Sequence, residues 1–204
     1  MAFSYPPNMT ERVFIIHGWG GNPLEAWIPW LKKALESRGC EVHAPAMPDT
    51  EAPVMDKWIA ALSLEVGTCD SHTHFVGHSI GCQTILRYLQ DLPSTTHAGK
   101  VALVAPWVHL LESSYEDEEE KEIAQPWLET PLDWESIKQH TAHFFALFSD
   151  DDDCVPVTDE PIFAQKLGAQ TLMLSGYGHF SGGDGIEQLP EVLSYILHSK
   201  IPDQ

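Results

Sequence analysis

The stretch HTHFVGHSIGCQ, residues 72–83, joins an apolar run to a Gly-x-Ser-x-Gly pattern. The apolar run predicts a buried strand, and Ile85, Leu86 and Leu89 continue at helical spacing beyond the pattern. A serine between two glycines is typical of a sharp strand–turn–helix junction, where the glycines let two backbones approach closely. A purely structural serine would need neither glycine. We therefore interpret Ser79 as a nucleophile held on a strained turn.

Apolar runs and helix-like segments alternate along most of the chain. Strands are expected over 12–17, 40–44, 72–77, 100–105, 142–149 and 170–174, and helices over 24–35, 55–66, 83–90, 161–167 and 189–197. Most of these strands are apolar on both faces, as parallel strands covered by helices must be. The sequence therefore predicts an α/β fold, a three-layer sandwich with a mostly parallel central sheet.

The length of 204 residues fits a single domain spanning residues 1–204. Residues 106–140 interrupt the alternation with the acidic cluster ESSYEDEEEKE and the stretch QPWLETPLDWESIK. Their position between two strands suits an acidic cap or insert within the domain. A solvated acidic helix without a role explains the same composition equally well.

The charge balance narrows the classes of partner. The chain has 30 acidic residues against 11 lysines and arginines, a formal charge of −19. This composition argues against nucleic acid, whose phosphates require basic residues, and against anionic membrane surfaces. The longest apolar-leaning run, 101–111, is too short for membrane insertion. No secretion signal is visible, and Cys40, Cys69, Cys82 and Cys154 form no C-x-x-C pair, so we expect free thiols and a cytoplasmic location.

A serine hydroxyl needs a general base to become a good nucleophile. In a fold of this type the expected order is Ser, then Asp or Glu, then His, each in a loop after a later strand. His179 lies in SGYGHFSGG, between the strand 170–174 and the final helix, and this position predicts that it is the base. His72 and His74 form a His-x-His pair, but no matching carboxylate cluster is near, so we expect packing or edge residues rather than a metal site.

The acid should follow the strand that precedes the histidine loop. There the chain reads SDDDDCVP, residues 149–156. A calcium loop spaces its ligands at alternate residues around a glycine turn, which this run does not do. A charged loop tip is the simpler explanation, and an aspartate that orients His179 is the functional one. Spacing does not separate Asp152 from Asp151.

A developing oxyanion needs preorganised N–H donors. The backbone of Ile80 is one candidate, because it follows the nucleophile at a helix N-terminus, where the helix dipole favours negative charge. The second donor should come from HGWGGNP, residues 17–23, with Trp19 preferred and Gly20 as the alternative. This loop lacks the lysine and the glycine spacing of phosphate-binding motifs, which disfavours a nucleotide site.

HGWGGNP, MPD, GHSIG, SDDDDCVP and GYGHF, in this order on so short a chain, resemble the small serine α/β-hydrolase family that includes retinoblastoma-binding protein 9. PLDWESIK also resembles that family's tryptophan-containing stretch before the acid-bearing strand. The resemblance runs from about Val13 to Leu197. It implies a compact α/β-hydrolase fold without the first antiparallel strands of larger members. By motif match it implies Ser79 as nucleophile, Asp152 as acid and His179 as base.

These observations predict a serine hydrolase that cleaves carboxylic esters or related acyl compounds through an acyl-enzyme. Its partner would be a small-molecule acyl substrate, and neither a metal nor an organic cofactor is expected. A peptidase or thioesterase on the same triad is an alternative. A protein-interaction module on a hydrolase fold is another, because Trp107, Trp127 and Trp134 could form a binding surface. A protein partner is compatible with the sequence, but nothing in it requires one.

Overall fold

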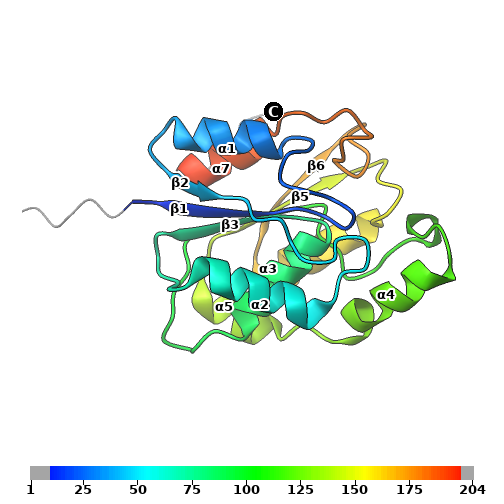
Figure 1. Ribbon diagram of the computed structural model, residues 1–204, viewed down its shortest axis with the longest axis horizontal. Coiled ribbons are helices and arrows are strands. Elements are labelled where there is room, and N and C mark those ends of the chain that lie inside the picture. The colour runs from blue at the N-terminus through cyan, green and yellow to red at the C-terminus, as the bar shows by residue number, and fades with distance from the viewer. Residues whose placement is uncertain (1–9, 199–204) are drawn as a thin grey trace, which may run out of the picture.

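The computed structural model describes residues 10–198, in which six strands form one sheet in the order β2-β1-β3-β4-β5-β6 (Figure 1). All neighbouring strands are parallel, which confirms the prediction of a mostly parallel sheet. The described sheet is in fact entirely parallel. The strands are β1 (Arg12–Ile16), β2 (Glu41–His43), β3 (Thr73–His78), β4 (Val101–Val104), β5 (Phe144–Ser149) and β6 (Gln170–Leu174).

Helices cover both faces of the sheet, which gives the three predicted layers (Figure 1). One face carries α1 (Ile28–Glu36) and α7 (Pro190–His198), and the other carries α2 (Met55–Val66), α3 (Ile80–Gln90), α5 (Trp134–His140) and α6 (Glu160–Leu167). The helix α4 (Glu118–Glu129) and two short 3-10 turns (Glu112–Ser114 and Val157–Asp159) complete the set. None of the helices within residues 10–198 has the length and apolarity that a membrane span needs.

The core lies on both sides of the central strands. Every residue of β3, β4 and β5 is buried, including polar Thr73 and Ser149. This is why these strands read as continuous apolar runs rather than as alternating ones. The edge strand β6 is only half-buried over most of its length.

The strand order reverses at one point of the sheet, beside β1. From β1 the chain crosses to β2 on one side, and the next strand, β3, returns to the other side of β1. In open parallel sheets, ligands bind outside the carboxyl ends of the strands at such a reversal. The loop 17–23 follows β1 and Ser79 follows β3, so both predicted elements of the site begin at this point.

The first helix begins later than predicted, at Ile28 rather than at Leu24. Asn22 accepts a hydrogen bond from the N–H of Leu24 and donates its own N–H to the carboxylate of Glu25. Ala26 has a positive φ of 48°, which a right-handed helix cannot accommodate. Because this turn replaces the first helical turn, Leu24 is 83% exposed instead of facing the core.

The segment 106–140 has two parts. The helix α5 packs against α3 and α6 and thus forms part of the helical layer. The helix α4 is fastened to α3 through Arg87, whose Nη2 donates to the carbonyl oxygens of Trp127 and Thr130, 2.8 Å away in each case. Residues 118–122 of the acidic cluster form the first part of α4 (Glu118–Glu129). We propose that only the part of the segment before α5 acts as a cap.

Candidate active site

Ser79 occupies a strained turn between β3 and α3. Its φ of 52° and ψ of −119° lie outside the regions that serine normally adopts, a strain that costs about 1–3 kcal/mol. A Cβ on Gly77 would lie 2.7 Å from the backbone nitrogen of Cys82, and one on Gly81 would overlap the carbonyl oxygen of Ile16. The two glycines of the pattern are therefore required by close backbone approach, as the sequence predicted.

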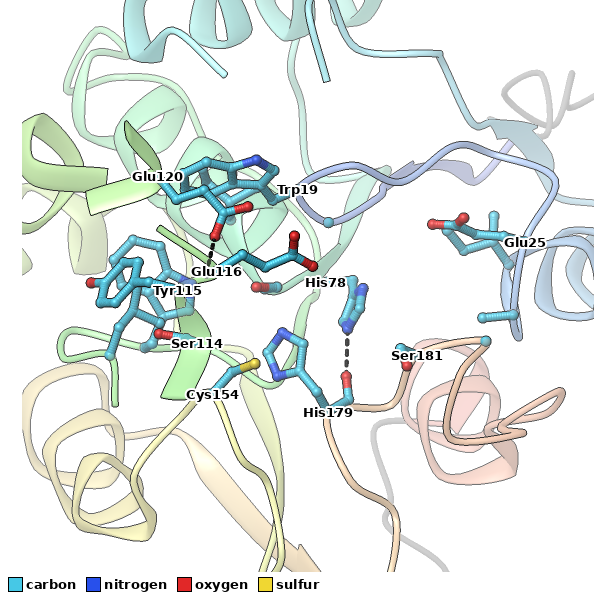
Figure 2. Close-up of a pocket in the computed structure, with 18 of the residues that line it drawn as sticks. Trp19, Glu25, His78, Ser114, Tyr115, Glu116, Glu120, Cys154, His179 and Ser181 are labelled. Atoms are coloured by element: carbon cyan, nitrogen blue, oxygen red, sulfur yellow. Dashed lines mark hydrogen bonds between the residues drawn. The ribbon is translucent and has the colours of Figure 1, made fainter. Parts of the chain in front are cut away.

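A cavity of about 270 Å³ opens beside this turn (Figure 2). Its walls come from the loops after β1, β3, β5 and β6 and from the segment between β4 and β5. The residues that line it include Gly18, Trp19, Glu25, Trp27, His78, Ser79, Ile80, Trp107, Leu110, Tyr115, Glu116, Glu120, Cys154 and His179. The predicted nucleophile, the predicted base and both predicted oxyanion donors thus line one cavity.

The loop after β6 brings His179 to the cavity, and the loop after β5 places Asp152 behind it. The imidazole Nδ1 lies 3.0 Å from each carboxylate oxygen of Asp152. Asp152 is buried, and its Oδ1 also accepts the N–H groups of Cys154 and Val155. The carboxylate that contacts His179 is therefore that of Asp152 and not that of Asp151.

The neighbouring aspartates position the histidine loop, a role that sequence reasoning missed. Asp150 accepts a hydrogen bond from Ser175 Oγ at 2.7 Å, and Asp151 accepts one from the N–H of Gly178 at 2.9 Å. The hydroxyl of Ser149, together with the Gly178 N–H, lowers the pKa of Asp151. The run of acids directly after a strand was the available signal, because consecutive carboxylates at a strand end can each accept donors from the adjacent loop.

Ser79 and His179 both line the cavity, but the hydrogen bonds within residues 10–198 do not include one between Ser79 Oγ and the imidazole. Hydrogen bonds between a nucleophile and its base are often long without substrate and tighten when substrate binds. Since Nδ1 faces Asp152, the other ring nitrogen, Nε2, is the one that remains for a reaction in the cavity.

The backbone N–H groups of Trp19 and Ile80 lie at the cavity and donate to no acceptor in the described part of the chain. Ile80 is the first residue of α3, where the helix dipole adds a partial positive charge. The N–H of Gly20 donates to the carbonyl oxygen of Thr50 at 2.9 Å and is therefore occupied. Of the two alternatives in this loop, the geometry favours Trp19.

His78, the residue before the nucleophile, is a second feature that sequence reasoning missed. Its Nε2 donates to the carbonyl oxygen of His179 at 2.8 Å, and the two ring centroids are 5.1 Å apart (Figure 2). Burial, with a smaller contribution from the charge of His179, lowers the pKa of His78 to about 3. His78 is therefore neutral at physiological pH and positions the backbone of His179.

His17 fixes the loop after β1 in a similar way. Its Nδ1 lies 2.8 Å from the carbonyl oxygen of Gly18, and its Nε2 accepts the N–H of Met47 at 3.0 Å. Burial lowers the pKa of His17, which keeps the ring neutral and able to act as both donor and acceptor. Through these two hydrogen bonds the His17 ring ties the backbone at Gly18, next to Trp19, to the loop that follows β2.

Asp152, Cys154 and His179 bring one oxygen, one sulfur and one nitrogen atom within 4.8 Å of one another. Burial raises the pKa of the Cys154 thiol to about 12, so the free thiol is protonated at neutral pH.

Within residues 10–198, His72 and His74 belong to no group of three or more potential metal ligands. His72 Nδ1 lies 3.1 Å and His74 Nε2 lies 2.6 Å from the two carboxylate oxygens of Glu11. His74 Nδ1 accepts the N–H of Lys100 at 2.8 Å. Both histidines thus have hydrogen-bonding roles at the end of the sheet opposite the cavity.

Three acidic side chains line the cavity. Glu116 and Glu120, from the segment after β4, lie on one side with Tyr115, and Glu25 lies across from them (Figure 2). Three carboxylates that line one cavity repel an anion and attract a cation.

The parallel sheet with helices on both faces, and a strained serine at the end of a central strand, define the α/β-hydrolase class of protein. The sequence over residues 13–198 matches the serine hydrolase family model, and the chain belongs to this family. The resemblance that the motifs predicted is thereby confirmed.

Three similar proteins illustrate the relationship. The YdeN protein of Bacillus subtilis (strain 168) is 30% identical over 188 residues, which cover 92% of this chain and 95% of YdeN, and its crystal structure superposes with a TM-score of 0.84. Serine hydrolase RBBP9 of Rattus norvegicus is 27% identical over 190 residues, covering 91% and 95% of the two chains. Est1E of Butyrivibrio proteoclasticus, solved with ferulic acid bound, is only 14% identical and shares the fold with a TM-score of 0.71, over 96% and 92% of the two chains.

Proposed function

We propose that this serine hydrolase cleaves carboxylic esters or related acyl compounds with Ser79 as nucleophile, His179 as base and Asp152 as the acid. One observation carries the proposal. Ser79 is held on a strained turn at the edge of a cavity, and the imidazole of His179 in that cavity has its Nδ1 against both oxygens of Asp152.

In the first half of the reaction, Ser79 Oγ attacks the acyl carbon while His179 Nε2 takes the hydroxyl proton. Asp152 accepts the hydrogen bond from Nδ1–H, which fixes the tautomer and stabilises the imidazolium. The N–H groups of Trp19 and Ile80 hold the oxyanion, and donors of this kind each contribute about 10²–10³-fold in kcat. His179 then protonates the leaving alcohol, and the acyl group remains on Ser79.

In the second half, a water molecule replaces the alcohol. His179 Nε2 removes one proton of this water, and the resulting hydroxide attacks the acyl carbon of the ester formed with Ser79. The same two N–H groups hold the second oxyanion. Collapse breaks the bond to Ser79 Oγ, which takes its proton back from His179, and the carboxylic acid product leaves.

The test is labelling with a fluorophosphonate probe, followed by turnover of aryl esters of increasing acyl length. We expect covalent labelling of the wild type, loss of labelling in Ser79→Ala and retention in Ser114→Ala, a second serine at the cavity. Turnover should favour short acyl chains, because the cavity holds about 270 Å³.

Absence of labelling in folded protein would refute the proposal and favour a protein-interaction role. Labelling without ester turnover, but with turnover of peptides or thioesters, would keep the triad and correct the substrate class.

A further inference from the structure

A thiol lies beside the proposed base, and the proposed reaction gives it no role. Cys154 lines the cavity at Ser79 together with His179, and its sulfur atom points toward the imidazole ring (Figure 2). A carboxylate oxygen of Asp152, the sulfur of Cys154 and an imidazole nitrogen of His179 lie within 4.8 Å of one another. An oxygen, a sulfur and a nitrogen atom this close together form a possible set of metal ligands.

The positions of these atoms are close to those that one zinc ion requires. Asp152 Oδ1 accepts the N–H groups of Cys154 and Val155, which fixes the carboxylate and leaves Oδ2, 3.0 Å from His179 Nδ1. Ligand atoms about 2.0–2.3 Å from a tetrahedral zinc lie roughly 3.2–3.7 Å from one another. The oxygen–nitrogen pair has nearly this separation. The thiol donates a long hydrogen bond of 3.5 Å to Asp153 Oδ1, so a small rotation is enough to complete the set.

The charges around the thiol attract a cation. Burial and the negative charges of Asp153, Asp152 and Asp184 together raise the pKa of Cys154. Three glutamates also line the cavity, and its lining within the described chain includes no lysine or arginine. A divalent cation would therefore be attracted and would meet no basic side chain there. A thiol loses its proton when it coordinates a metal, so its protonation in the free protein does not prevent binding.

We propose that Asp152 Oδ2, Cys154 Sγ and His179 Nδ1 bind a zinc ion, and that the bound zinc inhibits the hydrolase. A set of one sulfur, one nitrogen and one oxygen ligand suits Zn²⁺, whereas Mg²⁺ and Ca²⁺ require oxygen ligands. Three protein ligands leave the fourth tetrahedral position to a water molecule from the cavity. The zinc is a reversible inhibitor in this proposal and takes no part in the reaction.

The inhibition rests on the proposed function, whereas the binding rests on the geometry alone. When zinc binds, the Cys154 thiol releases its proton to solvent, and the proton on His179 Nδ1 is exchanged through solvent to Nε2. Nε2 then carries a hydrogen and has no lone pair to accept the proton of Ser79 Oγ. Asp152 coordinates the metal and no longer orients the imidazole. No covalent bond to Ser79 forms or breaks, so removal of the zinc should restore activity.

Binding is measured with Co²⁺ and Zn²⁺ in the absence of substrate. Bound Co²⁺ should give the charge-transfer absorption of a cobalt–thiolate bond, and added Zn²⁺ should remove this absorption. Cys154→Ser, or Cys154→Ala should the first variant misfold, should abolish the band and weaken zinc binding at least about a hundredfold, because the thiolate is the strongest zinc ligand of the three. Cys40→Ser is the matched control. Cys40 is also a free, half-buried cysteine, and it lies beside His72 and His74 in a different cavity, so this variant should bind zinc as the wild type does.

Inhibition is measured as the rate at which a fluorophosphonate labels Ser79. Saturating Zn²⁺ should slow labelling of the wild type at least about a hundredfold, because the base is held in the wrong tautomer, and EDTA should restore the rate. Mg²⁺ should not slow labelling. The folded Cys154 variant, compared with its own rate without metal, should keep that rate at the zinc concentration that saturates the wild type.

Three results would overturn the proposal: no cobalt–thiolate band, equal zinc affinity in the wild type and a folded Cys154 variant, or normal labelling of the zinc-saturated wild type. A wild type that shows the band, loses it in Cys154→Ser and yet is not labelled even with EDTA would support the metal site and refute Ser79 as the nucleophile. Failure of the metal site and failure of the proposed function therefore give different results.

Discussion

Replacing Gly81 with alanine tests the contact that shapes the turn at the nucleophile. A Cβ at this position would lie 2.7 Å from the carbonyl oxygen of His17, about 0.7 Å closer than the 3.4 Å at which ordinary contact begins, and closer still to that of Ile16. Both oxygens belong to the backbone at the end of β1, where Ile16 pairs with Gly77 of β3. Neither carbonyl can rotate away without disturbing this pairing.

The cost follows from the geometry. Forcing an extra carbon into a packed site costs about 1–3 kcal/mol, and rigid backbone neighbours place Gly81→Ala near the upper value. The higher helix propensity of alanine returns at most about 1 kcal/mol. A net loss of about 2 kcal/mol corresponds to a melting midpoint about 4–8 °C lower for a domain of this size. Since the clash also moves the serine turn, fluorophosphonate labelling should slow as well.

The assay compares thermal unfolding and labelling rate across the wild type, Gly81→Ala and Gly183→Ala. Gly183 is the matched control, because a Cβ there meets only the flexible hydroxyl of Ser181, at 3.3 Å. We expect the control to unfold and label as the wild type does. A Gly81→Ala protein with the midpoint and labelling rate of the control would show that the close approach between β1 and α3 does not hold this turn.

Three further outcomes are expected. Asp152→Asn should lower kcat for ester hydrolysis about 10³–10⁴-fold, because the base loses its correct tautomer, whereas Asp151→Asn should lower it less than about tenfold; equal losses would contradict the assignment of the acid. The pKa of His78 in the folded chain, about 3, lies below its ordinary value, so at acid pH the unfolded chain binds a proton that the folded chain does not bind. The free energy of unfolding therefore decreases as pH falls below about 6. In urea unfolding between pH 4 and 6, His78→Gln should therefore lose up to about 1.4 kcal/mol less per pH unit than the wild type, and parallel curves would refute the reasoning. Glu116→Gln should raise kcat/KM for an anionic aryl ester about 3- to 10-fold and leave a neutral ester unchanged, with the gain shrinking in high salt; Glu122→Gln, at an exposed position of α4, should leave kcat/KM for both esters unchanged.

The sheet was predictable because its signal is local. Strands buried on both faces must be apolar throughout, and runs such as HTHFVG and KVALVA show this directly in the sequence. The turn at Ser79 was predictable for a related reason, since the glycines that permit the close approach flank the serine itself. His179 could be placed because its loop follows a strand and precedes the last helix.

What the sequence left open depends on contacts between distant segments. Adjacent aspartates have the same spacing to any motif, so only the family resemblance favoured Asp152, and the structure shows that each neighbour has a different partner. The choice of Trp19 over Gly20 rests on the carbonyl of Thr50, thirty residues away. The role of His78 rests on a carbonyl 101 residues away. No local pattern encodes contacts of this kind.

The later start of α1 has a local cause that was nevertheless hidden. Leu24 fits the helical spacing, but Asn22 and Glu25 close a turn around it and leave it in solvent. Periodicity records which positions could face a core. It does not show whether side chains that accept backbone N–H groups stabilise a turn in place of the helix.

Different connections between the strands supply different parts of the cavity wall. Ser79 and His179 come from the connections after β3 and β6, whereas Tyr115, Glu116 and Glu120 come from the connection between β4 and β5. Exchanging residues 108–120 for the equivalent piece of a relative would therefore alter which molecules enter while leaving the proposed reacting atoms in register. Mutations in this segment would therefore change which substrates enter the cavity, while mutations elsewhere would change the residues proposed to react.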